Sequence, residues 1–212
     1  MKRETEIKEL LINNAIHLIA TGGFECATTK ELAHSGGNLP DFRMNEVYVY
    51  RIFGSKENIY EAAFDRLDRE LSGACREAFI MATKTEKDFS PSMQERVFNF
   101  LESVWEFILR NEERCRCYVR YYYSIYFKGT SYEEHKRLFA GLVAEMTVAF
   151  KEEADVFAIL HSVFITMLDF AIRVYNGEIM NDEINRPHVF NVLYCMMATY
   201  FKNAPDPFGD KK

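Results

Sequence analysis

The longest continuous pattern in the sequence is helical. After Ser55, apolar residues recur at spacings of three and four as far as about Thr83, namely Ile59, Ala62, Ala63, Leu67, Leu71, Ala78 and Phe79. The same spacing fills most of the remaining chain, which is interrupted by only five prolines and ten glycines. The sequence therefore predicts an all-α protein.

We expect about nine helices, three short ones followed by six longer ones. Helix-start signals are the capping boxes Thr28–Glu31 and Ser131–Glu134, the N-cap residues Asn45 and Ser55, and Pro91 at a first helical position. Glycines at 22, 36, 129 and 177 are expected to end helices. The predicted ranges are 5–20, 28–34, a short helix after 45, 55–83, 91–111, 114–127, 131–152, 154–176 and 187–202.

Composition narrows the class of protein. A hydrophobic content of 48% excludes a disordered chain. A net charge of −6 argues against a protein that coats nucleic acid or anionic membrane non-specifically, although a local basic patch remains compatible with it. No run of 18 apolar residues occurs, and the nearest one, 156–168, carries His161, Ser162 and Thr166, so we interpret it as a buried helix and expect no membrane partner.

The ends and the cysteines indicate the compartment. The charged N-terminus lacks the apolar region of a signal peptide, which predicts a cytoplasmic protein. Five scattered cysteines suit free thiols in a reducing compartment. Cys115 and Cys117 stand two residues apart, hence on different helix faces, and no histidine lies at ligand spacing beside them. We expect no metal and no cofactor.

Three short helices in the first 54 residues, with a glycine-containing turn between the second and third, outline a helix-turn-helix domain. The segment 11–60 resembles the N-terminal domain of the TetR family of transcriptional regulators. The matching positions are Leu11, Ile12 and Ala15 in the first helix, Gly23 and Phe24, Thr28 followed by Leu32 and Ala33, and the closing set Tyr50, Phe53, Ser55, Lys56 and Glu57. The sequence departs from the family by an apparent insertion of about six residues centred on 38–43, and by Val47 and Tyr48 where the family often has Gly and Thr.

The heptapeptide Val47–Phe53 is β-branched and aromatic, which by propensity alone favours a strand. An isolated strand among helices would leave its backbone groups without partners, and Tyr50 and Phe53 have a helical spacing. We therefore assign the segment to the recognition helix and the turn after it.

The resemblance implies a DNA-binding domain over 1–54, in which the recognition helix enters the major groove. We expect Asn45, Glu46 and Tyr48 to face bases and Thr28, Thr29, Lys30, Tyr50 and Lys56 to hold phosphates, with Arg43 and Arg51 as further candidates that lack a family counterpart. In the alternative interpretation Tyr48 and Tyr50 are half-buried packing residues, while Val49, Ile52 and Phe53 form core. Residues 1–57 hold seven Lys or Arg against eight Asp or Glu, so binding would depend on a small cationic cluster and on dimerisation.

The resemblance also implies a helical domain over 55–203 that binds an effector and forms a homodimer, followed by a flexible tail over 204–212. Segments 155–175 and 187–201 are apolar nearly all round and suit the dimer interface, with burial inside the monomer as the alternative. Candidate residues lining a site for a small apolar or aromatic effector are Phe79, Phe98, Trp105, Tyr118, Tyr121, Tyr122 and Tyr126, although such aromatic stripes are more often core.

Three functions compete at this point. The first is a regulator, expected to be a repressor, that binds a palindromic operator as a homodimer and is released by its effector. The second is an interaction protein of the same fold that has lost sequence-specific DNA binding. The third, a helical enzyme, ranks lowest because no nucleophile, carboxylate-pair or phosphate-loop signature has usable spacing.

Overall fold

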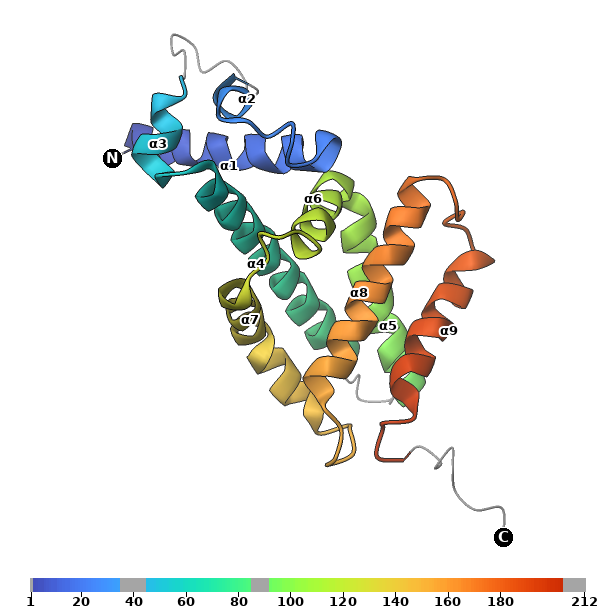
Figure 1. Ribbon diagram of the computed structural model, residues 1–212. Coiled ribbons are helices and arrows are strands. Elements are labelled where there is room, and N and C mark those ends of the chain that lie inside the picture. The colour runs from blue at the N-terminus through green and yellow to red at the C-terminus, as the bar shows by residue number, and fades with distance from the viewer. Residues whose placement is uncertain (1, 35–44, 85–91, 204–212) are drawn as a thin grey trace. The chain divides into compact units, whose positions relative to one another are not determined.

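The structure is a computed structural model that describes residues 2–34, 45–84 and 92–203. Its described residues form helices and no strand, which confirms the all-α prediction. The helices are α1 (Lys2–Gly22), α2 (Thr29–His34), α3 (Val47–Phe53), α4 (Lys56–Thr83), α5 (Met93–Arg110), α6 (Glu112–Tyr122), α7 (Gly129–Thr147), α8 (Val156–Tyr175) and α9 (Asn185–Ala198) (Figure 1).

The chain divides into two compact units. Unit 1 is Met1–Glu70 with Asn111–His135, and unit 2 is Leu71–Arg110 with Lys136–Lys212. Long helices α4 and α7 therefore each contribute to both units. The expected DNA-binding domain, 1–54, lies inside unit 1, which also contains the first half of α4 and all of α6.

Unit 1 is built around α1, which contacts α2, α3 and α6 (Figure 1). Leu11, Ala15 and Ile19 of α1 are fully buried. Two arginines tie this helix to its neighbours: Arg120 of α6 donates to the Ile19 carbonyl at 2.9 Å, and Arg66 of α4 pairs with the Glu9 carboxylate. The bond at the end of α1 and the ion pair along it are thus both made by residues far away in the sequence.

Unit 2 is organised by α5, α8 and α9, which contact one another. Trp105 of α5 is buried, donates its indole N–H to the Asn181 side chain at 3.1 Å, and meets Phe190 of α9 edge-on. The Tyr175 hydroxyl, at the end of α8, donates to the Ile108 carbonyl at 2.6 Å. These bonds hold the connection between α8 and α9 against α5.

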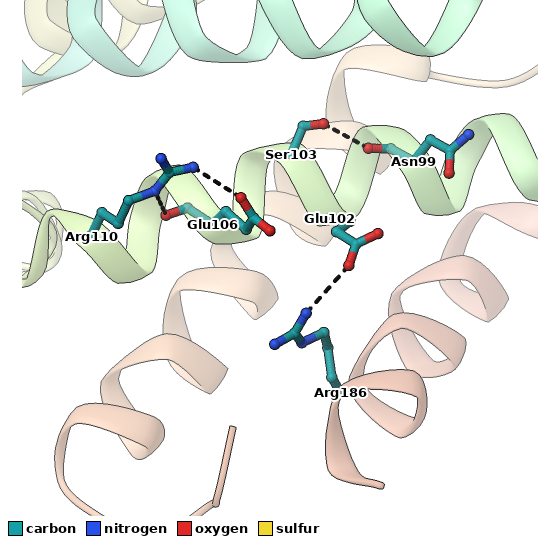
Figure 2. Close-up of polar contacts among 6 residues, drawn as sticks. All are labelled: Asn99, Glu102, Ser103, Glu106, Arg110 and Arg186. Atoms are coloured by element: carbon teal, nitrogen blue, oxygen red, sulfur yellow. Dashed lines mark hydrogen bonds and ion pairs between the residues drawn. The ribbon is translucent and has the colours of Figure 1, made fainter. Parts of the chain in front are cut away.

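Hydrogen bonds and ion pairs connect the polar side chains of α5 (Figure 2). Arg110 bonds both the Glu106 carboxylate, at 2.9 Å, and the Glu106 carbonyl, and the Ser103 hydroxyl donates to the Asn99 carbonyl. Arg186, in the first turn of α9, reaches across to Glu102 at 3.3 Å. Such exposed pairs add little stability each, but the last one joins two helices.

Several predicted helix starts are confirmed and one is replaced. The Thr28 hydroxyl accepts from the Glu31 N–H at 3.2 Å, and the Ser55 hydroxyl accepts from the Asn58 N–H at 3.3 Å. The predicted start at Pro91 lies outside the described residues. Helix α5 begins at Met93, where the sequence Ser92-Met93-Gln94-Glu95 forms a reciprocal capping box that the sequence analysis missed.

Three predicted helix ends are wrong. Helix α6 ends at Tyr122 and not at 127, because the Ser124 hydroxyl bonds the Tyr121 carbonyl and the Tyr126 N–H and so competes with helical bonding. Helix α7 ends at Thr147 and not at 152, and α9 at Ala198 and not at 202. These two ends share a cause: the Lys151 N–H bonds the Tyr200 carbonyl at 2.8 Å and the Lys202 N–H bonds the Ala149 carbonyl at 3.1 Å, so the two chain segments pair with each other.

The predicted capping box Ser131–Glu134 is also wrong. Helix α7 begins at Gly129, two residues earlier, and Ser131 is buried within its first turn. Gly129, expected to end the preceding helix, therefore starts the next one, while Gly177 does follow α8 with a positive φ of 74°.

Candidate nucleic-acid interface

The candidate interface consists of α2, α3 and the start of α4. Leu32 and Ala33 of α2 are buried, and the end of α2 is held by Asn14 of α1, whose side-chain amide donates to the Leu32 carbonyl at 2.7 Å. The apparent insertion at 38–43, and with it Arg43, lies outside the described residues. Helices α2 and α3 nevertheless contact each other and α1, the arrangement expected of a helix-turn-helix domain.

The strand-like heptapeptide is a helix, and α3 coincides with Val47–Phe53. Tertiary packing overrides local propensity here, because Val49 is completely buried against the rest of unit 1. The expected N-cap, Asn45, is one residue early: the N-cap position is Glu46, yet the Asn45 side-chain oxygen still accepts from the Val47 N–H at 3.1 Å. The first turn is therefore stabilised by Asn45.

A tight turn joins α3 to α4. Gly54 adopts a φ of 77°, in the left-handed region that favours glycine, and its N–H donates to the Tyr50 carbonyl at 2.9 Å. The Asn58 side-chain amide donates to the Phe53 carbonyl at 2.6 Å. These bonds set the direction of α3 relative to the start of α4, where Ser55 and Lys56 stand.

The side chains predicted to hold phosphates are accessible. Thr28, Lys30 and Tyr50 are exposed, with Tyr50 at 56%, and Thr29 and Lys56 are partly buried. The Lys56 ammonium lies 5.9 Å from the centre of the Tyr60 ring. The Tyr60 hydroxyl donates to the Ala27 carbonyl, in the loop that precedes α2.

The side chains predicted to face bases have local partners. The Thr29 hydroxyl donates to a Glu46 carboxylate oxygen at 2.8 Å, which links α2 to the start of α3. The Asn45 oxygen bonds the Val47 N–H, as above. Tyr48 is partly buried, and the Arg51 guanidinium carbon lies 4.4 Å from the centre of its ring. A cation–π contact of this kind orients the arginine.

Val47 belongs to this surface and was not among the predicted residues. Its side chain is 65% exposed at the first position of α3. A helical wheel would have placed it on the outer face, four residues before Arg51, had the start of the helix been known.

The predicted effector residues are distributed over both units. Tyr118, Tyr121, Tyr122 and Tyr126 belong to unit 1, whereas Phe79, Phe98 and Trp105 belong to unit 2. Their role as lining residues remains a prediction.

In unit 1 the tyrosines of α6 and of the loop after it pack on other aromatic rings. Tyr121 stacks on Phe64 at 4.6 Å between centroids, and Tyr126 lies 4.7 Å from Phe24 and 5.3 Å from Tyr60. Burial raises the pKa of the Tyr60 and Tyr121 hydroxyls above the usual value. This packing is what the alternative interpretation, in which the aromatic stripe is core, anticipates.

In the part of the chain that the structure describes, cysteine and the other residue types that bind metals form no metal site. Within the described ranges, no group of three His, Cys, Asp or Glu side chains could hold a metal ion. Cys115 and Cys117 are both buried free thiols.

Comparison with known proteins places the fold. No protein-family model matches the sequence, and no curated protein matches it. Among solved structures, a TetR family transcription regulator from Marinobacter aquaeolei VT8 is similar, with 15% identity, a TM-score of 0.71, and coverage of 92% of this chain and 98% of that chain.

Two further structures show the range of proteins with this fold. One, from Shewanella sp. PV-4 and assigned to the same family, has 14% identity and a TM-score of 0.69 over 89% of this chain and 96% of that chain. The superantigen PfiT has 14% identity and a TM-score of 0.57 over 93% of this chain and 97% of that chain. At such identities the likeness establishes the fold, and the activity has to be argued from the residues.

Proposed function

We propose that this chain, whose fold is that of the TetR family of transcriptional regulators, is a DNA-binding regulator of transcription. The observation that carries the proposal is helix α3, which presents Val47, Tyr50 and Arg51 outward while Val49 anchors it in unit 1. A short, anchored helix with an exposed cationic and aromatic face suits the major groove.

Phosphate contacts fix the register of such a helix. Tyr50 lies in α3, and Thr28, Lys30 and Lys56 lie before and after it; all four present hydroxyl or ammonium donors. Since few cations are involved, the affinity should fall only modestly with salt for each protomer, and two protomers should double the slope.

The proposed assembly is a homodimer through 155–175 and 187–201. Only Val156, Val163, Met167, Leu168 and Ala171 of α8 are buried, although the helix is apolar over its length. On α9 and the residues after it, Val192 and Tyr200 are exposed. Covering these surfaces with a second copy would form a four-helix bundle and set two recognition helices about 34 to 36 Å apart on a palindromic operator.

The proposed regulation is release from the operator by a small apolar or aromatic effector. It is supported by the aromatic side chains of α4 to α6 and by the continuity of α4, which begins beside α3 and runs for 28 residues into unit 2. Binding that shifts such a helix would change the spacing of the recognition helices. A cytoplasmic location is part of this proposal.

A second function, an interaction protein without sequence-specific DNA binding, is favoured by one comparison. The superantigen PfiT has a similar fold. A protein with this fold therefore need not be a regulator that binds an operator.

The test is a selection of genomic DNA fragments by the purified full chain at two salt concentrations. The regulator should select one palindromic site, and uniformly weak retention of all fragments would instead support the interaction protein.

Two substitutions test the predicted roles on the selected site. Lys56→Ala should weaken binding of all sequences and lower the salt slope by about 1 per protomer, whereas Asn45→Ala should relax specificity. Lys84→Ala, at the exposed residue that follows α4, is the matched control and should leave binding unchanged. If neither Lys56 nor Asn45 matters, the assigned register is wrong.

A further inference from the structure

The outermost face of α3 is formed by Val47 and Arg51. Positions two residues before and after a helical residue lie roughly on the opposite side of the helix. Val49 is 0% exposed, so Val47 and Arg51, one helical turn apart, both point away from the core, while Tyr48 and Tyr50 lie at the flanks. The geometry points to Val47 and Arg51 as a base-contacting pair, with Arg51 bound to guanine and Val47 packed on the methyl group of thymine. This inference rests on the proposed DNA-binding function.

Arg51 is held over the ring of Tyr48. Its guanidinium carbon lies 4.4 Å from the Tyr48 ring centre. Stacking of a guanidinium on a ring leaves its N–H edge free to donate in the plane, and two parallel N–H donors match guanine O6 and N7. Tyr48 is thereby a positioning residue for Arg51.

Val47 supplies the apolar part of the surface. Its side chain is exposed by 65% although it is β-branched and apolar, and it stands at the start of the helix, where side chains come nearest to base edges. An aliphatic side chain in the major groove distinguishes pyrimidines by the C5 methyl group of thymine.

The residues before the helix are occupied by local structure. Asn45 bonds the Val47 N–H and Glu46 accepts from Thr29, at 3.1 and 2.8 Å. Both side chains serve the join between α2 and α3. Val47 and Arg51 take no part in that join, so their side chains add to the sequence discrimination predicted for Asn45.

The experiment measures binding of the full chain to its selected site and to analogues altered at single bases. Replacing the contacted guanine by 7-deazaguanine removes N7 and keeps base pairing, and replacing the thymine by deoxyuridine removes only the methyl group. The wild type should lose roughly 5- to 150-fold in affinity on loss of the guanine contact. It should lose about fourfold on loss of the methyl group.

Variants assign each loss to a side chain. Arg51→Ala should become insensitive to 7-deazaguanine but keep its response to deoxyuridine, and Val47→Ala should do the reverse. Tyr48→Phe, which keeps the ring, should retain the guanine preference, whereas Tyr48→Ala should reduce it. Circular dichroism and thermal unfolding check that each variant folds.

Contrary outcomes are distinct. If Arg51→Ala weakens every sequence equally and lowers the salt slope, Arg51 contacts a phosphate and the inference is overturned while DNA binding stands. If the wild type selects no site at all, both the inference and the proposed function fail.

Discussion

The Asp68 carboxylate of α4 is buried among polar partners in unit 1. It accepts from the Tyr118 hydroxyl of α6 at 3.0 Å and contacts the His135 ring of α7 at 2.9 Å. All three side chains are almost fully buried. A buried carboxylate persists only when it is bonded in this way, so the cluster determines how three helices of unit 1 pack.

Asp68→Ala should therefore destabilise the fold by about 3–5 kcal/mol, since two buried polar groups lose an acceptor. Asp169→Ala removes an exposed carboxylate paired with Arg173 one turn away and should cost at most about 0.5 kcal/mol. Urea unfolding followed by circular dichroism measures both. Equal effects of the two substitutions would contradict the structural role of Asp68.

Cys117 provides a test at alkaline pH. Burial, with a smaller contribution from Glu113, raises the pKa of its thiol to about 12, and Arg120 opposes this only in part. An unfolded chain ionises the thiol above about pH 9, its ordinary value, so the folded state holds the proton more tightly. The stabilisation is complete below pH 9 and is lost as the pH rises toward 12.

The unfolding free energy of the wild type should consequently fall between pH 9 and 12, and Cys117→Ala should show a smaller fall over that range. Urea titrations at neutral and alkaline pH measure the difference. A Cys117→Ala variant with the full alkaline loss would assign the effect to other groups, such as the buried hydroxyls of Tyr60 and Tyr121.

At the scale of elements, α4 begins beside the candidate DNA surface and continues into unit 2. It begins at a serine cap, the Ser55 hydroxyl accepting from the Asn58 N–H, and continues without a break for 28 residues. Its start also carries Lys56. The cap thus positions a predicted phosphate contact as well as stabilising the helix.

Ser55→Ala should lower the unfolding free energy by about 0.5–2 kcal/mol through loss of the cap. Ser103→Ala, at an exposed position in the middle of α5, is the matched control and should change stability by less than about 0.5 kcal/mol. Thermal unfolding measures both. If Ser55→Ala is as stable as the wild type but binds DNA more weakly, Ser55 positions the predicted phosphate contact of Lys56 and does not stabilise the helix.

At the scale of the whole molecule, α8 poses the question of what covers it. By length and composition it could cross a membrane, and it is the helix in the described ranges that meets this criterion. Its buried positions, spaced by three, four and seven residues, already pack inside unit 2. We interpret its remaining apolar surface, with that of α9, as the contact with a second copy.

Val192→Glu should weaken this dimer at least ~100-fold, because a charge would be buried without a partner. Val148→Glu, at another exposed valine outside the predicted interface, should leave the dimer intact. Sedimentation of the full chain across a dilution series measures both. A wild-type monomer that binds lipid vesicles would contradict dimerisation and favour a membrane surface as the cover of α8.

Much of the candidate site could be predicted because its signals are local. The caps at Thr28 and Ser55 and the helical spacing of Tyr50 and Phe53 each involve neighbours within one turn. The outer face of α3 could not be predicted in the same way. It depends on Val49 being buried by helices distant in sequence, and on Arg51 stacking on Tyr48.

The sequence by itself determined the helical class and, for the described residues, the number of helices and most of their starts, since backbone propensity, periodicity and capping act over a few residues. Only the tertiary structure decided where α7 and α9 end, because Lys151 and Lys202 bond a segment about fifty residues away. It likewise decided that Tyr126 packs on Phe24 and that Tyr121 of α6 packs on Phe64. Long-range contacts of this kind have no local signature, because any exposed backbone group or aromatic ring could have formed them.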